Sequence, residues 1–320
     1  MSFFSDVERE MQVRGTELIA DDILMIEIVP TNGRPLPLWE PGAHIDLRLP
    51  GGTERQYSLC GVPAERGFWR IAVLREPEGR GGSVAAHDLS AGQIIRVRGP
   101  RSHFAFTPPV AGERVSLVAG GIGITPILPM VHAAASTGAD WSLDYAVRSG
   151  ARAAFAAELA DAYGERVRLH DASTGARLDV AAVVAERGEG RIWACGPTRL
   201  LDALGDAASG LEEGVLHTEQ FVAGELAAPV RPGPFEVELA SSGEVLTVPE
   251  DKSVLEVLEE NDVFVVSSCR EGTCGTCETM VLEGEVDHRD AILTPGERAE
   301  NTLMMVCVSR AACPRLVLDV

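Results

Sequence analysis

Apolar and polar residues alternate in short runs along the first third of the chain. The clearest runs are residues 23–29, 44–49, 68–74 and 94–98, which are bounded by glycine or proline turns. Short strands at this spacing are typical of a barrel. The pattern therefore predicts a β-barrel domain over residues 1–108.

Strands and helices alternate in the next part of the chain. The predicted strands are residues 115–119, 142–147, 166–170 and 191–194, and the predicted helices are residues 126–136, 152–163, 179–186 and 198–209. This alternation predicts an α/β domain over residues 109–222, with a parallel sheet that binds a nucleotide at its carboxyl edge. Residues 115–139 contain no Asp, Glu, Lys or Arg, but their central glycines and prolines favour a strand, a turn and a helix over a membrane span.

The last third of the chain begins with a change in composition. Residues 223–234 hold three prolines and two glycines, which is typical of a linker. Residues 235–320 are predicted to form a small α+β domain. Its expected elements are a hairpin of residues 235–239 and 244–248, a helix at 253–260 and strands at 279–283 and 316–320. We therefore expect a multidomain protein with three domains and one linker.

Charge is spread unevenly over these domains. The 320 residues include 48 acidic and 28 basic side chains, which gives a net charge of −20. Residues 235–320 alone hold 18 acidic and 6 basic side chains, a net charge of −12. This balance disfavours nucleic acid or an anionic membrane as a partner, and it favours a basic partner protein. Residues 1–10 are polar and acidic, so we expect no signal peptide and a cytoplasmic location.

Four of the seven cysteines have the spacing of a plant-type [2Fe–2S] site. They are Cys269, Cys274, Cys277 and Cys307, in the pattern C-x4-C-x2-C with 29 residues before the last cysteine. Four thiolates complete the tetrahedral sulfur sets of two irons that share two bridging sulfides. Gly272 and Gly275 would let backbone amides approach the cluster sulfurs.

Two alternatives to the cluster remain, a zinc site and a set of buried thiols. Zinc sites more often repeat C-x2-C pairs, and this region has one such pair. Cys313 competes with Cys307 as fourth ligand, but Pro314 follows Cys313, whereas Cys307 ends an apolar run. Cys60 and Cys195 are expected to lie outside the metal site.

Two short motifs in the barrel domain have the chemistry of a flavin site. In the first, Arg55 can pair with a phosphate, the Tyr57 face can stack on a flat ring, and the Ser58 hydroxyl can bond a ring nitrogen. The second, Gly79-Arg80-Gly81-Gly82-Ser83, precedes a predicted helix at residues 84–89 with Ser83 as its N-cap, which suits a phosphate. An ordinary strand and a solvent-exposed loop are the alternatives.

Two further motifs lie at the predicted carboxyl edge of the parallel sheet. Gly120-Gly121-Ile122-Gly123-Ile124-Thr125-Pro126 joins a strand to a helix and allows close approach of a pyrophosphate, although it is not the full dinucleotide fingerprint. Cys195-Gly196-Pro197 occupies the same kind of position after a later strand. Such a tripeptide on its own is usually only a turn.

Together these motifs resemble the FMN-containing oxygenase reductases of the ferredoxin–NADP reductase superfamily, of the phthalate dioxygenase, vanillate O-demethylase and carnitine monooxygenase reductase type. The resemblance covers nearly the whole chain and includes the domain order of flavin barrel, nucleotide domain and ferredoxin domain. It implies FMN contacts at Arg55, Tyr57, Ser58, Arg80, Gly81, Gly82 and Ser83. It implies nucleotide contacts at Gly120, Gly121, Gly123, Thr125, Pro126, Cys195, Gly196 and Pro197, and it places Phe221, in the segment His217 to Phe221, near the flavin ring.

The resemblance also implies the cofactors FMN, NADH and a [2Fe–2S] cluster. FMN is favoured over FAD because the phosphate loop closes over a terminal phosphate. Arg148 follows the second strand of the nucleotide domain, where an arginine can accept the 2′-phosphate of NADPH, so the NADH assignment stays open at this position. We expect hydride transfer from NADH and delivery of single electrons to a terminal oxygenase, of the Rieske type.

Other functions are weighed against this one. The sequence contains no C-x-H pair, which disfavours a Rieske oxygenase. The flavin and nucleotide motifs disfavour a non-catalytic electron carrier. A reductase that serves a diiron or cytochrome P450 oxygenase is the alternative among enzymes, and the sequence does not name the final substrate.

Overall fold

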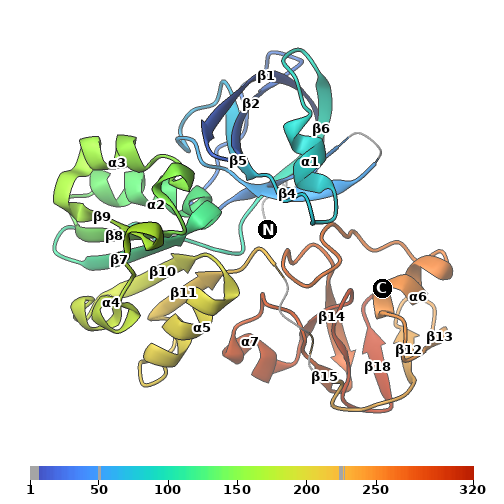
Figure 1. Ribbon diagram of the computed structural model, residues 1–320. Helices are drawn as coiled ribbons and strands as arrows, with labels where there is room; N and C mark the ends of the chain where they lie inside the picture. The colour runs from blue at the N-terminus through green and yellow to red at the C-terminus, as the bar shows by residue number, and fades with distance from the viewer. Residues whose placement is uncertain (1–6, 50–51, 223–225, 227) are drawn as a thin grey trace. The chain divides into compact units, whose positions relative to one another are not determined.

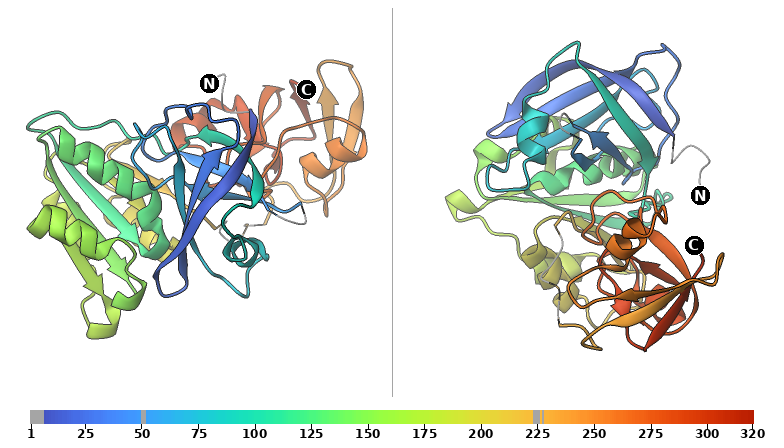
Figure 2. Two further views of the ribbon diagram at one scale, coloured as in Figure 1. Left: turned by 90° about the horizontal axis from the view of Figure 1, so that it is seen from above. Right: turned by 90° about the vertical axis from the view of Figure 1, so that its right-hand side faces the viewer.

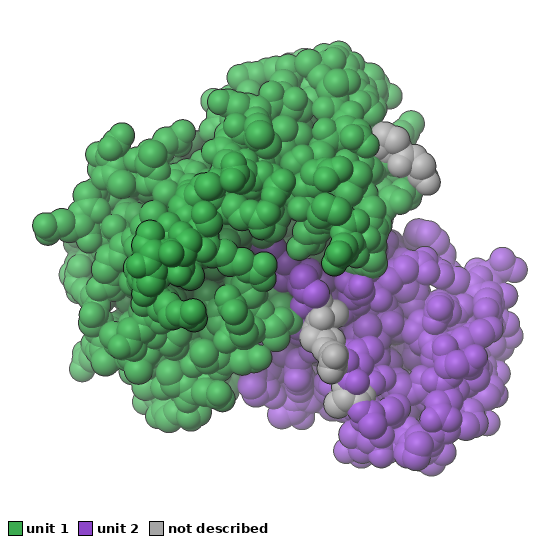
Figure 3. Space-filling model, viewed as in Figure 1, with its two compact units in different colours: residues 1–220 green, residues 221–320 purple. Residues whose placement is uncertain are grey.

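The computed structural model describes residues 7–49, 52–222, 226 and 228–320. They form two compact units, Met1–Gln220 (unit 1) and Phe221–Val320 (unit 2), which are coloured separately in Figure 3. The two predicted N-terminal domains thus lie in one unit. Residues 223–225 and 227 of the predicted linker lie outside the described residues.

The first sheet of unit 1 has six antiparallel strands. Their spatial order is β4 (Glu54–Ser58), β3 (His44–Arg48), β6 (Ile94–Arg101), β1 (Glu8–Ala20), β2 (Ile23–Pro30) and β5 (Trp69–Leu74). Leu59, directly after β4, forms an isolated bridge with Ile71 of β5, so the two edges of the sheet approach each other. The sheet is therefore barrel-like, as predicted, with Ile26, Ile45 and Val97 in its core (Figure 1).

The second sheet of unit 1 is parallel, which confirms the α/β prediction. Its order is β11 (Leu216–Glu219), β10 (Arg191–Cys195), β7 (Arg114–Gly120), β8 (Asp140–Val147) and β9 (Val167–Asp171). Leu117 packs in the core with α2 (Ile124–Ser136) and α3 (Ala156–Tyr163), whereas Val118 packs with α4 (Val180–Glu186) and α5 (Thr198–Ala207). Helices thus cover both faces of the sheet (Figures 1 and 2).

One hydrophobic core joins the two sheets of unit 1. Phe104 and Phe106, which follow β6, are buried in the same cluster as Leu117 of β7. Trp193 of β10 lies edge-on to Phe106 with ring centroids 5.0 Å apart, and its Nε1 donates a hydrogen bond to Ala105 O at 3.1 Å. The sheet that carries the predicted flavin residues is therefore fixed to the sheet that carries the predicted nucleotide residues.

Unit 2 has the predicted α+β composition. Its main sheet has the order β13 (Val245–Val248), β12 (Phe235–Leu239), β18 (Arg315–Leu318), β14 (Glu278–Glu283) and β16 (Leu303–Met305), and β15 (Val286–Asp287) pairs with β17 (Arg310–Ala311). The helices are α6 (Val254–Glu260) and α7 (Pro295–Glu300). The helix predicted at residues 253–260 is α6, and Ser253 and Glu256 form a capping box at its start.

Candidate functional site

The four cysteines predicted as cluster ligands lie together in unit 2. Cys269, Cys274 and Cys277 lie between α6 and β14, and Cys307 follows β16. Hydrogen bonds from the thiols of Cys274 and Cys307 lower the pKa of Cys269. The Cys307 thiol lowers the pKa of Cys277 in the same way. Four sulfur atoms linked by such contacts are the donor set that a [2Fe–2S] cluster needs.

Backbone amides surround the sulfur atoms of this loop. The donors are Glu271 N and Thr273 N to Cys269 Sγ, at 3.3 and 3.4 Å, and Thr276 N to Cys274 Sγ, at 3.4 Å. Gly272 and Gly275 have left-handed φ angles of 71° and 68°, and a Cβ on Gly272 would lie 2.6 Å from Val308 Cγ2. The loop thus offers N–H groups to thiolate charge, which fits an iron–sulfur cluster.

Cys313, the alternative fourth ligand, makes its contacts elsewhere in unit 2. Its sulfur accepts a hydrogen bond from Glu285 N at 3.1 Å and donates one to Arg315 O at 2.9 Å. Cys60 and Cys195 are buried in unit 1. The geometry therefore favours Cys307 as the fourth ligand.

Arg55 connects the two motifs predicted to bind FMN. It lies on β4, and its Nη2 donates a hydrogen bond to Arg80 O at 2.9 Å. A Cβ on Gly82 would lie 2.4 Å from Arg55 Cγ, so the arginine side chain packs directly against the backbone of the loop. Burial raises the pKa of Tyr57, also on β4, to about 12, which keeps its hydroxyl protonated. Ser58 ends the strand and is buried.

Ser83 is not the N-cap of the following helix, so that prediction is wrong. Helix α1 (Gly82–His87) begins earlier than expected, with Gly81 as its N-cap. Gly81 has a φ angle of 76°, a left-handed conformation that glycine adopts far more readily than serine. The Ser83 hydroxyl instead accepts a hydrogen bond from Glu76 N at 2.9 Å and closes the loop.

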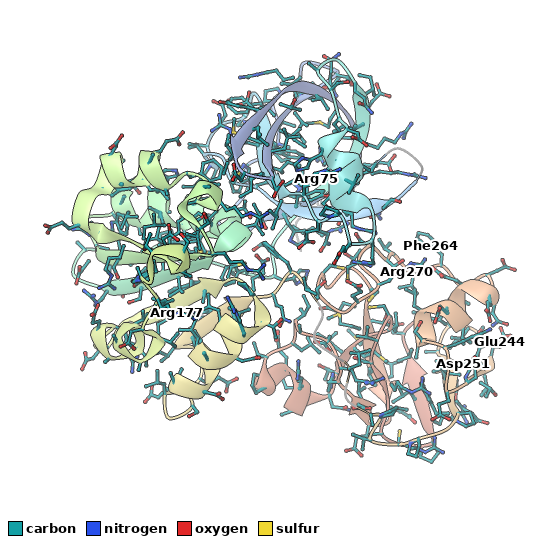
Figure 4. All side chains as sticks on the ribbon, viewed as in Figure 1. Arg75, Arg177, Glu244, Asp251, Phe264 and Arg270 are labelled. Carbon is teal, nitrogen blue, oxygen red and sulfur yellow. The ribbon has the colours of Figure 1, made fainter. Side chains whose placement is uncertain are left out.

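Arg75 is a candidate phosphate ligand that the sequence analysis missed. It is exposed and directly follows β5, next to Glu76 at the base of the same loop (Figure 4). Within the described ranges its side chain has no ion pair. An arginine that follows a strand and precedes a glycine-rich loop was the available signal.

The two turns predicted to bind the nucleotide lie against each other. Strands β7 and β10 pair in parallel, so Gly120 and Cys195 end at the same edge of the sheet. A Cβ on Gly123 would lie 2.3 Å from Cys195 O, and a Cβ on Gly120 would lie 2.6 Å from Pro197 Cδ. A Cβ on Gly196 would lie 3.0 Å from Gly120 Cα. The structure thus brings both motifs into one site.

The start of α2 is shaped by three of the predicted residues. Gly121 has a left-handed φ angle of 56° and begins the 3-10 turn Gly121–Gly123. Thr125 is buried, and its Oγ1 donates a hydrogen bond to Ile122 O at 3.0 Å. Pro126 lies in the first helical turn, where backbone N–H groups have no partner within the helix.

Arg148 and Asp171 lie at the carboxyl ends of neighbouring strands. Arg148 is exposed directly after β8 and has no ion pair in the part of the chain that the structure describes. Asp171 pairs with Val147 in the register of β8 and β9. The Ser173 hydroxyl and the Gly150 amide donate hydrogen bonds to the Asp171 carboxylate, at 2.6 and 2.8 Å, and these bonds lower its pKa. A fixed negative charge, which the sequence analysis missed, therefore lies near Arg148.

Glu219, which the sequence analysis named only as part of the segment His217 to Phe221, lies beside Cys195 at the end of β11. The two residues are paired in the register of β10 and β11. The Oε2 atom of Glu219 is buried and has no hydrogen-bond partner in the described part of the chain. Burial raises the pKa of Glu219 to about 8, and burial likewise raises the pKa of the Cys195 thiol.

The remaining residues of the predicted segment make contacts of their own. The His217 ring stacks on Trp193 with ring centroids 4.4 Å apart, and burial lowers its pKa. Gln220 Nε2 donates a hydrogen bond to Thr198 Oγ1 at 3.0 Å, which ties the end of unit 1 to α5. Phe221 is 40% exposed and is the first residue of unit 2.

Comparisons with known proteins agree with these features. The family model described as 2Fe-2S iron-sulfur cluster binding domain matches residues 237–312. The chain is 43% identical, over 96% of its length and 98% of the relative, to a putative toluene-4-sulfonate monooxygenase system reductase subunit of Comamonas testosteroni. Among the described residues, no helix is long and apolar enough to span a bilayer.

Two solved structures match 98% of the chain. One is phthalate dioxygenase reductase, described as a modular structure for electron transfer from pyridine nucleotides to [2Fe–2S], with 37% identity, a TM-score of 0.71 and 98% of that chain covered. The other is a full-length cytochrome P450 of Tepidiphilus thermophilus, with 44% identity and a TM-score of 0.83. The chain spans 42% of the length of that P450.

These matches extend over nearly the whole chain and not only over its iron–sulfur domain. Of the expected cofactors, a pyridine nucleotide and a [2Fe–2S] cluster are those named for phthalate dioxygenase reductase, and the family model describes a [2Fe–2S] domain. The chain belongs to the phthalate dioxygenase reductase family, whose members are oxidoreductases that carry electrons from a pyridine nucleotide to a [2Fe–2S] cluster.

Proposed function

We propose that this chain is the reductase component of a Rieske-type oxygenase system, located in the cytoplasm, and that it passes electrons from NADH through FMN and a [2Fe–2S] cluster to the oxygenase. The observation that carries the proposal is the near full-length likeness to a monooxygenase system reductase subunit. The four clustered cysteines and the paired nucleotide turns support it.

The residues of unit 1 suit the binding of both small molecules. Arg55 and the loop amides around Gly82 would hold the FMN phosphate, and the Tyr57 face would support the ring. The Gly120–Pro126 turn and the Cys195–Pro197 turn would hold the dinucleotide. FMN, when bound, accepts the two electrons of a hydride and releases them singly, as the cluster requires.

Neutral groups line the edge where Cys195 lies. The raised pKa values of Cys195 and Glu219 keep the thiol and the carboxyl protonated at pH 7. Neither group then places a fixed negative charge beside the nicotinamide, so neither would favour the oxidised, positively charged dinucleotide over NADH. These two residues would therefore shape the pocket without biasing the redox state of the bound nucleotide.

Within unit 2, the chain's own groups prepare the cluster site. The amides of Glu271 and Thr273 point at Cys269 Sγ and would favour its thiolate form. The linkage of Cys269, Cys277 and Cys307 through their sulfur atoms would keep the ligand set in place.

A cytochrome P450 is the second candidate partner. The observation in its favour is the 44% identity to the reductase part of an intact self-sufficient P450 monooxygenase, with a TM-score of 0.91. In that structure the matched region makes up 41% of the chain. A reductase with the same domains would pass its electrons to a P450 in place of a Rieske oxygenase.

The proposal is tested with the purified full chain. We expect FMN, with two irons and two acid-labile sulfides per chain, and NADH-driven reduction of a Rieske oxygenase component. The first acceptor would be the oxygenase of the toluene-4-sulfonate monooxygenase system, with a purified P450 assayed in parallel. Released FAD, stoichiometric zinc in place of iron, or turnover of the P450 alone would overturn the proposal.

A further inference from the structure

Phe264 has an exposure that the fold of unit 2 does not require. Its side chain is 86% exposed, the largest value among the large apolar side chains of the described residues. It lies on the segment between α6 and the cysteine loop and is labelled in Figure 4. Single exposed apolar residues are common on protein surfaces, so exposure alone does not indicate a binding role for Phe264. Its position in the fold and its neighbours must supply the argument.

The backbone holds Phe264 outward through its two neighbours. Val263 and Val265 pack against the hydrophobic core of unit 2. Val263 N also donates a hydrogen bond to Leu258 O at 2.9 Å. With the valine on each side fixed inward, Phe264 is presented to solvent by an anchored backbone. A side chain held in this way loses little conformational freedom when a partner covers it.

The same segment leads directly into the cluster site. Phe264 precedes Cys269 by five residues, so the chain itself limits their separation to about 18 Å. Arg270, which follows Cys269, forms an ion pair with Glu259 at the end of α6. The segment of residues 259–270 is therefore closed at its base, and it places the aromatic side chain close to the route by which electrons leave the chain.

Acidic residues lie close to Phe264 in the sequence. Glu260 is paired with Lys252 and Glu259 with Arg270. Asp262 is exposed and has no ion pair within the ranges that the structure describes. Residues 235–320 as a whole carry a net charge of −12. A domain with this charge complements a partner surface rich in Lys and Arg.

We propose that Phe264 is the apolar anchor with which unit 2 docks on the terminal oxygenase, in a pocket rimmed by Lys and Arg. This inference rests on the proposed function, because it assumes an oxygenase as the acceptor. Electron-transfer complexes are small and short-lived, so one aromatic residue at the centre can supply much of the affinity. The net negative charge of residues 235–320 accelerates encounter, and Phe264 sets how long the complex lasts.

The test compares Phe264→Ala with wild type and with Leu282→Ala. Leu282 is a matched control because it is 49% exposed and lies on β14, five residues beyond Cys277 and so about 16 Å along an extended strand. The acceptor is the oxygenase component of the toluene-4-sulfonate monooxygenase system, at varied concentration. We expect Phe264→Ala to raise the KM for this acceptor about tenfold or more, equivalent to about 1.4 kcal/mol.

Three further measurements separate this role from others. NADH-driven reduction of the cluster, followed by stopped flow, should be unchanged in Phe264→Ala. Phe264→Leu should restore most of the affinity. The KM ratio of variant to wild type should persist at about 0.5 M salt, where charge steering is screened.

Several results would overturn the inference. An unchanged KM in Phe264→Ala, or an equal rise of the KM in Leu282→Ala, would show that Phe264 is not the docking anchor. Slower reduction of the cluster in Phe264→Ala would mean that Phe264 acts in electron transfer within the chain. If wild type is a dimer and Phe264→Ala is a monomer, Phe264 instead binds a second copy of this chain. If wild type reduces ferricyanide with NADH but never drives an oxygenase, the proposed function fails as well, which distinguishes the two failures.

Discussion

A Cβ atom added to Gly123 would lie 2.3 Å from the carbonyl oxygen of Cys195. Gly123 ends the turn after β7, and Cys195 ends β10, which pairs with β7. The backbones of these two loops, which are 72 residues apart in the chain, therefore lie too close together for a side chain on Gly123. The obstacle is backbone and not a flexible side chain, so it cannot move aside without shifting a strand end.

Gly123→Ala should therefore damage the nucleotide site. We expect the KM for NADH in ferricyanide reduction to rise about tenfold or more, with a loss of about 1–3 kcal/mol in the free energy of unfolding. Gly205→Ala is the control, because a Cβ there meets nothing within 4 Å and α5 would gain helix propensity. Equal behaviour of the two variants in NADH kinetics would contradict the contact.

The cluster and the flavin path should be separable by one substitution. Cys274→Ser should lose iron and oxygenase turnover but keep NADH-dependent ferricyanide reduction, since that dye can take electrons from the flavin directly. Cys313→Ser should keep its iron, because Cys313 bonds Glu285 and Arg315 instead. If Cys274→Ser lost both activities with FMN still bound, the division of the path would be mistaken. Iron loss in Cys313→Ser would reassign the fourth ligand.

Nucleotide preference should depend on Asp171. Its carboxylate is held by Gly150 and Ser173 at the edge where the adenosine ribose would bind, and it would repel a 2′-phosphate. We expect wild type to favour NADH, Asp171→Asn to raise kcat/KM for NADPH several-fold, and Arg148→Ala to lower it. Steady-state kinetics with both nucleotides decides this. An enzyme that prefers NADPH, and loses that preference in Arg148→Ala, would refute the NADH assignment.

The parallel sheet was predictable because strands alternate with helices along the chain and its neighbouring strands β7 and β10 are nearly continuous apolar runs. The predicted strand at residues 115–119 lies inside β7, for example. By contrast, β1 was missed, although it pairs with both β2 and β6. Only Met11 and Val13 of its 13 residues are buried, so charged side chains on the exposed face hide the pattern. The short edge strand β11 was missed for a similar reason, since it holds a single aliphatic residue.

The candidate site divides in the same way. The four cysteines and the glycine turns are local motifs; the spacing of the cysteines indicated a cluster, and the resemblance to a known family assigned the turns to a nucleotide. Glu219 gains its raised pKa from burial beside Cys195 on another strand, and Asp171 is held partly by the amide of Gly150, 21 residues earlier in the chain. No local pattern contains these contacts. At Ser83 a local pattern was misleading. A serine before a helix predicted an N-cap, but the helix begins at Gly82 with Gly81 as its N-cap, in a left-handed conformation that favours glycine.

The buried carboxyl of Glu219 should make the stability of unit 1 depend on pH. In the unfolded chain this carboxyl loses its proton near pH 4.5, whereas in the folded chain it keeps the proton up to about pH 8. Between these values the folded state binds one proton more than the unfolded state. Stability therefore falls as pH rises through this interval, by at most about 1.4 kcal/mol per pH unit, and levels off above it.

Glu219→Gln removes this titration and keeps the shape of the side chain. At about pH 5 we expect the variant to unfold at nearly the wild-type urea concentration. Between pH 5 and about pH 8 its free energy of unfolding should rise above that of wild type, by a few kcal/mol. All four tryptophans, at positions 39, 69, 141 and 193, lie in unit 1, so their fluorescence follows that unit alone. Glu212→Gln, at an exposed position, is the control, and the pH dependence of its free energy of unfolding should follow that of wild type. If Glu219→Gln also ran parallel, the folded carboxyl would have to ionise near its ordinary pKa, and Glu219 would not be the neutral group that the structure places beside Cys195.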